Sequence, residues 1–149
     1  MEKEALKSVH LFWQEGDPGN SFQHQLQKIV NKYLHQAKQE KTDQNLKKFT
    51  LHLEDDTGAF VGGAVVTMHQ YWLQILLLAL VKSRRGYGFG RLMLQAIEDK
   101  AQELDCKRIR TETCEVNVGF YQRCGYKMMG KLEDYPPGLN YFWLHKDLE

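Results

Sequence analysis

The 149-residue chain has little of what marks secreted, membrane-spanning or nucleic-acid-binding proteins. Its three cysteines, Cys106, Cys114 and Cys124, are odd in number and lack the spacing of paired metal ligands. This argues against a disulfide framework and against a zinc site. The formal net charge of +1 gives no electrostatic reason to expect a nucleic-acid or anionic-membrane partner. The most apolar run, residues 71–81, is far shorter than the roughly 20 residues of a membrane-spanning helix.

The remaining composition is that of an ordinary globular protein. Hydrophobic residues make up 42% and charged residues 26% of the chain, which excludes wholesale disorder. The N-terminal residues 1–4 alternate in charge and lead into no long apolar run, so they do not resemble a signal peptide. We therefore expect one cytoplasmic domain over residues 1–149, with reduced thiols and no metal.

The first 45 residues predict one strand and one helix. An apolar run at 9–13 predicts a first strand, and the glycine- and proline-containing segment 16–20 predicts a turn. Ser21 stands where a helix N-cap would, and apolar residues then recur at helical spacing to about Gln39. The polar segment 38–45 predicts a loop.

Three strands with short connections are expected next. Residues 49–53 alternate as a half-buried strand does, and 55–58 is a hairpin turn sequence. Residues 59–68 are the expected partner strand. The apolar run 71–81 follows and predicts a strand buried on both faces. The three together predict an antiparallel meander.

The second half of the chain predicts alternating helices and strands. A glycine-rich segment, 86–90, precedes an amphipathic helix. The elements expected after it are a strand at 107–113, a short helix at 116–124, and strands at 126–132 and 140–145. The whole order predicts an α+β fold with a mixed, mostly antiparallel sheet of about six to seven strands, flanked by about three to four helices.

The glycine-rich segment is also the clearest chemical motif, Arg84-Arg85-Gly86-Tyr87-Gly88-Phe89-Gly90-Arg91. Glycines between a strand and a helix let backbone N–H groups approach an anion, and the helix N-terminus adds positive potential. Arg85 and Arg91 supply cationic partners for phosphate. The dinucleotide pattern fails because Arg91 or Met93 stands at its third glycine, and no Lys-Ser/Thr completes a P-loop. A different kind of pyrophosphate cradle remains.

Three segments together resemble the GNAT acetyltransferase superfamily, in particular its small bacterial-type members. Arg85-x-x-Gly88-x-Gly90 resembles the family's Gln/Arg-x-x-Gly-x-Gly/Ala signature. Phe120-Tyr121-Gln122-Arg123-Cys124-Gly125-Tyr126 resembles its Phe-Tyr-x-x-x-Gly-Phe/Tyr segment. The segment 133–138, followed by 141–144, is similar to the end of many members. The resemblance covers residues 47–147 and implies the GNAT fold.

The resemblance implies that acetyl-CoA, used as the acetyl donor, binds in a cleft where the family's fourth strand splays from the fifth. The pantetheine arm would pair with the backbone of Leu78, Ala79 and Leu80, which would equally serve as strand core. The pyrophosphate would bind the loop that contains Arg85, Gly86, Tyr87, Gly88, Phe89, Gly90 and Arg91. The family often has a cofactor-binding asparagine about seven residues before its catalytic tyrosine. Asn117 is only four before Tyr121, so the connecting loop is shorter or the role is absent.

The resemblance also assigns the two proton-transfer roles. Tyr121 matches the tyrosine that protonates the departing thiolate, and a phenol with a pKa of about 10 suits that step. The competing interpretation of Tyr121 is a structural core tyrosine. An amine with a pKa of about 10.4 is almost wholly protonated at pH 7, so the site must also accept a proton.

Two residues, Glu112 and His69, are candidates for the proton acceptor, and Gln74 is excluded. Gln74 stands where histone-type members have a glutamate, and an amide cannot take the proton. Glu112 lies near the place of the glutamate used by members that resemble ribosomal-protein acetyltransferases. It could equally form a surface ion pair with Arg110 or Lys107. His69 is a weaker candidate.

The expected activity is N-acetyl transfer to a primary amine of a small molecule or peptide, by direct attack in a ternary complex. The alternative is a non-catalytic acyl-CoA-binding sensor or regulatory module on the same fold. No nucleic-acid or membrane partner is expected, and a homodimer is left open. Six residues are candidates for the acceptor site, and the alternative for each is a plain core or surface role. They are Trp72, Glu133, Asp134, Tyr135, Tyr141 and Trp143.

Overall fold

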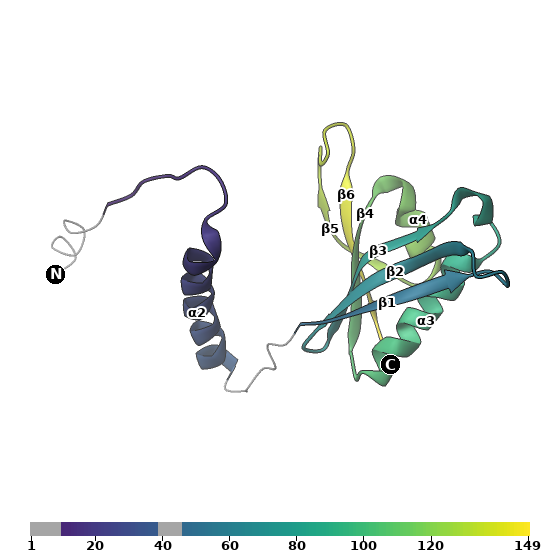
Figure 1. Cartoon of the computed structure of the whole chain (residues 1–149), viewed down its shortest axis with the longest axis horizontal. Coiled ribbons are helices and arrows are strands. Elements are labelled where there is room, and N and C mark those ends of the chain that lie inside the picture. The colour runs from purple at the N-terminus through teal and green to yellow at the C-terminus, as the bar shows by residue number, and fades with distance from the viewer. Residues whose placement is uncertain (1–9, 39–45) are drawn as a thin grey trace. The chain divides into compact units, whose positions relative to one another are not determined.

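The computed structural model describes residues 10–38 and 46–149 of the chain (Figure 1). Two compact units make up the chain, residues 1–42 and residues 43–149. The fold is α+β, as the sequence predicts, with one six-stranded, mostly antiparallel sheet and three α-helices in the described residues. No helix in the described part of the chain is long and apolar enough to cross a membrane.

The first unit contains helix α2, Gly19–Lys38. The helix begins two residues before the predicted N-cap, and the Oδ1 atom of Asp17 accepts a hydrogen bond from the Gly19 N–H at 2.9 Å. The apolar stripe of α2, from Phe22 to Tyr33, is at least half exposed. The strand predicted at 9–13 is wrong for residues 10–13, which have no partner strand among the described residues. Val9 and the predicted loop at 39–45 lie outside the described residues.

The second unit contains the sheet and two helices. In chain order its elements are β1 (Lys47–Glu54), β2 (Phe60–His69), β3 (Trp72–Leu80), the 3-10 turn η1 (Lys82–Arg84), α3 (Phe89–Glu103), β4 (Arg108–Cys114), α4 (Glu115–Arg123), β5 (Lys127–Leu132) and β6 (Tyr141–Asp147). The order of the strands across the sheet is β1-β2-β3-β4-β6-β5. Strands β1, β2 and β3 form the predicted antiparallel meander.

The core of the second unit lies between the sheet and the helices α3 and α4, which cover one face of the sheet (Figure 1). The apolar stripe predicted for the first of these helices is confirmed. Leu94, Ile97 and Ala101 are at most 3% exposed and pack with Leu73 and Ile109 of the sheet. Burial of such side chains, each worth about 1.5–3 kcal/mol, fixes both helices on the sheet.

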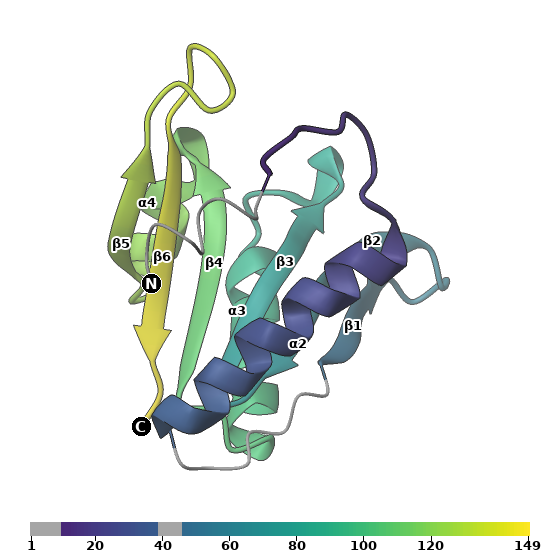
Figure 2. The ribbon, with the colours of Figure 1, turned by 90° about the vertical axis from the view of Figure 1, so that its left-hand side faces the viewer.

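Strand β3 separates from β4 partway along its length (Figure 2). The two strands are parallel neighbours only from Trp72–Arg108 to Ile75–Thr111. The register of β2 with β3 shifts at this point, so that Leu76 faces no residue of β2, which is a β-bulge. A bulge bends its strand and turns β3 away from β4. The two strands therefore form a fork that opens after Ile75.

The fork corrects one prediction. Strand β3 was expected to be buried on both faces, but Leu76 is 42% and Leu77 66% exposed. Because β3 has no neighbour on one side after Ile75, its second half lines an opening rather than the middle of the sheet.

A part-buried ion pair links α3 to the end of β6. Lys146 Nζ lies 2.7 Å from Glu98 Oε1 and donates to the Cys124 carbonyl oxygen at 2.9 Å. Lys146→Met leaves a mostly buried carboxylate unpaired, so we expect the free energy of unfolding to fall by about 1.5–3 kcal/mol. Urea denaturation measures this change. Lys131→Met, which breaks the exposed pair with Glu133, should cost under about 1 kcal/mol. Equal losses in the two variants would contradict the role of the Lys146 pair.

Candidate active site

A cleft of about 890 Å³ occupies the fork between β3 and β4. Its walls come from the second half of β3, the glycine-rich loop, the first turn of α3, the end of β4, and α4. All predicted cofactor-binding residues except Tyr87 line this cleft, as do both predicted catalytic residues. Tyr87 is 72% exposed and lies against Phe89, with ring centroids 6.3 Å apart.

The glycine-rich loop presents backbone donors to the cleft. Gly86 and Gly88 have φ angles of 86° and 85°, a left-handed conformation that side chains other than glycine rarely adopt. Gly88 is the N-cap of α3, and no side chain in the described residues caps this helix end. The first N–H groups of a helix have no partner within it. They are therefore available to an anion, and the helix dipole favours negative charge there.

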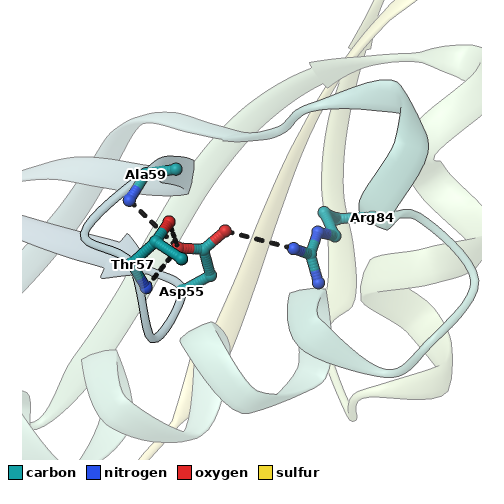
Figure 3. Close-up of polar contacts among 4 residues, drawn as sticks. All are labelled: Asp55, Thr57, Ala59 and Arg84. Atoms are coloured by element: carbon teal, nitrogen blue, oxygen red, sulfur yellow. Dashed lines mark hydrogen bonds and ion pairs between the residues drawn. The ribbon is translucent and has the colours of Figure 1, made fainter.

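A hydrogen bond from Arg84, just before the glycine-rich loop, to Asp55 of the β1–β2 hairpin ties these two segments together (Figure 3). Arg84 Nη2 lies 3.3 Å from Asp55 Oδ2. The other carboxylate oxygen of Asp55 accepts from the N–H groups of Thr57 and Ala59, at 2.9 and 3.0 Å. Hydrogen bonds, chiefly that from the Thr57 hydroxyl, lower the pKa of Asp55, so the carboxylate stays charged and keeps Arg84 in place.

The backbone of β3 and the side chains of Arg85 and Arg91 line the cleft next to the loop. From Leu76 to Leu80, β3 has no strand on the side of the fork, so its backbone can pair with an extended ligand. Arg85 Nε donates to the Leu80 carbonyl oxygen at 3.2 Å, which holds this guanidinium at the end of β3. Arg91 Nη2 reaches the Arg123 carbonyl oxygen at 3.5 Å. Neither guanidinium forms an ion pair with a described acidic residue.

Tyr121 extends from α4 into the inner part of the cleft. It is 6% exposed and packs edge-on against Phe120 and Tyr126, with centroids 5.1 and 5.4 Å away. Burial raises the pKa of the Tyr121 phenol, and a hydrogen bond with Thr111 partly opposes the shift. A tyrosine hydroxyl is protonated at neutral pH, as a proton donor must be, and the raised pKa extends this protonated range to higher pH.

Glu112 lies one residue beyond the last β3–β4 pair, at the inner end of the fork. Its side chain is exposed, and no ion pair of Glu112 occurs among the described residues. The suggested partner Arg110 instead donates from Nη2 to Gln74 Oε1 at 2.8 Å. The ion-pair alternative with Arg110 or Lys107 is therefore wrong, and Glu112 lines the cleft.

Residues missed at the site include Thr111, Cys114 and Arg123. Tyr141, predicted as an aromatic wall of the acceptor site, starts β6 opposite Cys114 and lines the cleft. Burial chiefly, and then the carboxylate of Glu112, raises the pKa of Tyr141. The strand register that places it there joins segments 27 residues apart, so its position relative to Cys114 does not follow from a local pattern.

The remaining candidates for the acceptor site and for the proton acceptor lie outside the lining of the cleft. Trp72 stacks on Arg108 with the guanidinium 5.5 Å from the ring centroid, and Trp143 covers Gly130. Glu133 pairs with Lys131 at 3.3 Å. His69, Asp134 and Tyr135 also lie outside the lining.

Asn117 does line the cleft, and its Nδ2 atom lies 3.7 Å from Cys114 Sγ. The cysteines are free thiols, as predicted. Among the described residues no group of three or more His, Cys, Asp or Glu side chains could hold a metal ion.

Comparison with known sequences decides the family. The sequence model of the acetyltransferase (GNAT) family matches residues 11–126. The chain belongs to this family. A GNAT relative, the blasticidin-S acetyltransferase of Streptomyces morookaense, is 32% identical over 105 residues, which cover 69% of this chain and 77% of that protein.

Solved GNAT structures share the fold. An acetyltransferase from Bacillus cereus ATCC 14579 superposes with a TM-score of 0.79 at 26% identity, covering 91% of this chain and 98% of that one. An acetyltransferase from Bacillus anthracis str. Ames, solved in complex with acetyl coenzyme A, superposes with a TM-score of 0.55 at 19% identity. That match covers 62% of this chain and 58% of the other.

Proposed function

We propose that this GNAT protein is an acetyl-CoA-dependent N-acetyltransferase that acetylates a primary amine of a small molecule or peptide, by direct attack in a ternary complex. One observation carries the proposal. A single cleft combines backbone anion donors, an unpaired strand edge, a buried phenol and a carboxylate without an ion pair. These groups are required to hold a phosphorylated thioester and to move two protons.

The residues of the cleft fit acetyl-CoA. The N–H groups at the start of α3, with Arg85 and Arg91, would hold the pyrophosphate, and the free edge of β3 would pair with the pantetheine arm. A Cβ atom on Gly90 would lie 3.0 Å from the Phe120 ring, so this glycine allows α3 and α4 to meet beside the phosphate site. When bound, acetyl-CoA supplies an acyl group activated as a thioester.

Two side chains would move the protons. Glu112, at the inner end of the fork, would take the proton of the attacking amine. The Tyr121 hydroxyl would donate its proton to the sulfur that leaves. The cleft opens between these groups, so an amine and a thioester can meet there without a covalent enzyme intermediate.

Acetyl-CoA should therefore stabilise the fold, by about 2.7 kcal/mol at one hundred times its dissociation constant. In Gly88→Ala a side chain stands where the phosphate must approach the α3 N-terminus, and we expect the rise in unfolding temperature on adding acetyl-CoA to disappear. Gly58→Ala is the matched control, because Gly58 has a similar positive φ of 80° but lies in the β1–β2 turn. Both variants should lose similar intrinsic stability, and only Gly88→Ala should lose the shift. No shift in the unmodified protein would contradict acetyl-CoA binding.

We further propose that residues 1–149 act as one domain in the cytoplasm. The family match runs across both compact units, and the three cysteines are unpaired. A single cooperative unfolding transition and recovery in the cytosolic fraction are expected. Two separate transitions would contradict the one-domain proposal.

A further inference from the structure

The charged side chains that line the cleft are divided between its two ends. Three arginines, Arg85, Arg91 and Arg123, and one acid, Glu112, are the charged residues among the described lining residues. Arg85 and Arg91 follow the end of β3, while Glu112 lies at the fork beside Ile75. Five residues of extended strand separate these points, which is about 16 Å at 3.3 Å per residue.

Arg123 is the third arginine of the lining. It is the last residue of α4, and its carbonyl oxygen accepts from Arg91. Its guanidinium folds back over Gly119, where a Cβ atom would lie 3.2 Å from Nη1. Because its guanidinium lies over Gly119, this charge is only about 6 Å along the helix axis from the start of α4, which follows β4 directly. Arg85 and Arg91 therefore make one end of the cleft cationic, and Glu112 makes the other end anionic.

The anionic end also has an aromatic wall. Tyr141 pairs with Cys114 across β4–β6 and is thus a diagonal neighbour of Glu112, close enough for its carboxylate to add to the effect of burial in raising the pKa of Tyr141. The Tyr141 ring packs edge-on against Tyr135 with centroids 5.8 Å apart. Two backbone hydrogen bonds, Tyr135 N–H to the Leu139 carbonyl at 2.9 Å and Leu139 N–H to the Pro136 carbonyl at 3.0 Å, close the loop that holds Tyr135. A carboxylate beside an aromatic ring is a favourable environment for an organic cation.

Arg85 and Arg91 lie too far along β3 to offset Glu112 at this end. Arg110 precedes Glu112 by two residues, but it is hydrogen-bonded to Gln74 and does not line the cleft. A phosphate carried on the acceptor would therefore face a carboxylate at close range, and like charges at such distances repel.

We infer that the fork end binds the acceptor amine as a cation between Glu112 and Tyr141, and that this enzyme selects cationic amines over their phosphate esters. The inference rests on the proposed function and names the substrate class for it. Tyr141 acts as a specificity-determining residue through its ring, and Glu112 pairs with the ammonium group before it takes the proton.

Two matched pairs of acceptors test the charge selection, glucosamine with glucosamine 6-phosphate and ethanolamine with phosphoethanolamine. Thiol release from acetyl-CoA gives kcat/KM for each. We expect the unphosphorylated amine to be favoured at least tenfold in each pair that is acetylated. A phosphate ester that reacts as well as its parent amine would overturn the inference and leave the acetyltransferase function intact. If acetyl-CoA binds and no amine is acetylated, the proposed function fails and the inference fails with it.

Variants of the two stacked tyrosines test the wall. Tyr141→Leu should raise KM for the preferred amine about tenfold without changing KM for acetyl-CoA, whereas Tyr141→Phe keeps the ring and should retain the KM of the unmodified enzyme. Tyr135→Leu is the matched control, because Tyr135 is 58% exposed and lies outside the lining. An equal rise in KM in both leucine variants, or none in Tyr141→Leu, would remove Tyr141 from recognition. The phenylalanine variant keeps the test valid if Tyr141→Leu does not fold.

Discussion

Replacing Tyr121 with phenylalanine is expected to lower turnover by about 10²–10⁴-fold while acetyl-CoA affinity stays unchanged. The substitution removes the hydroxyl alone and keeps the ring that packs between Phe120 and Tyr126. Without its proton donor the enzyme must expel a free thiolate. Steady-state kinetics with saturating acetyl-CoA measure the loss, and thermal shift measures the affinity.

A neighbouring tyrosine provides the control. Tyr126 is equally buried, and its hydroxyl is the buried side-chain atom without a hydrogen-bond partner in the described residues. Tyr126→Phe should keep activity and cost no stability, because the group removed makes no hydrogen bond. If Tyr121→Phe also keeps turnover within a few-fold, Tyr121 is structural and water protonates the thiolate.

The pH dependence of kcat gives a second test of Tyr121. Burial raises the pKa of Tyr121, so the protonated donor persists above the ordinary tyrosine value of about 10. The loss of kcat that its deprotonation causes should therefore begin above this value. It should be missing from the profile of Tyr121→Phe.

Replacing Glu112 with glutamine is expected to lower kcat/KM by about 10²-fold or more, with little change in acetyl-CoA binding. The change is nearly isosteric and removes only the ionisable group. Because Glu112 forms no described ion pair, little stability should be lost with it.

Glu115→Gln is the matched control, since Glu115 is an exposed glutamate three residues later that does not line the cleft. It should retain full activity. Full activity in Glu112→Gln as well, with a pH profile that follows the pKa of the acceptor amine, would mean that solvent deprotonates the amine before it binds.

The sequence predicts most of the sheet because its strands and helices have strong local patterns. The alternation at 49–53, the turn at 55–58 and the helical stripe of α3 each depend on neighbouring residues, and each is confirmed. The run at 9–13 failed as a strand over residues 10–13 because an apolar run needs a partner strand, which propensity cannot supply.

The functional cleft depends on contacts that local patterns do not contain. The glycine loop and Tyr121 could be found from motifs, and the family resemblance implied that two strands splay at the cleft. The bulge at Leu76 could not be found, because it arises from the register of β2 with β3. The same holds for the position of Tyr141 relative to Cys114, which follows from the pairing of β6 with β4. The exposure of the second half of β3 was missed for the same reason.

The central claim is acetyl transfer from acetyl-CoA to an amine in the β3–β4 cleft. Incubation with acetyl-CoA and the cationic amine panel, with thiol release and the mass of the acceptor followed together, tests it most directly. The account predicts thiol release that depends on the amine, a gain of one acetyl group on the acceptor nitrogen, and loss of both in Tyr121→Phe. Binding of acetyl-CoA without thiol release for any amine would contradict it and would favour a non-catalytic acyl-CoA-binding module.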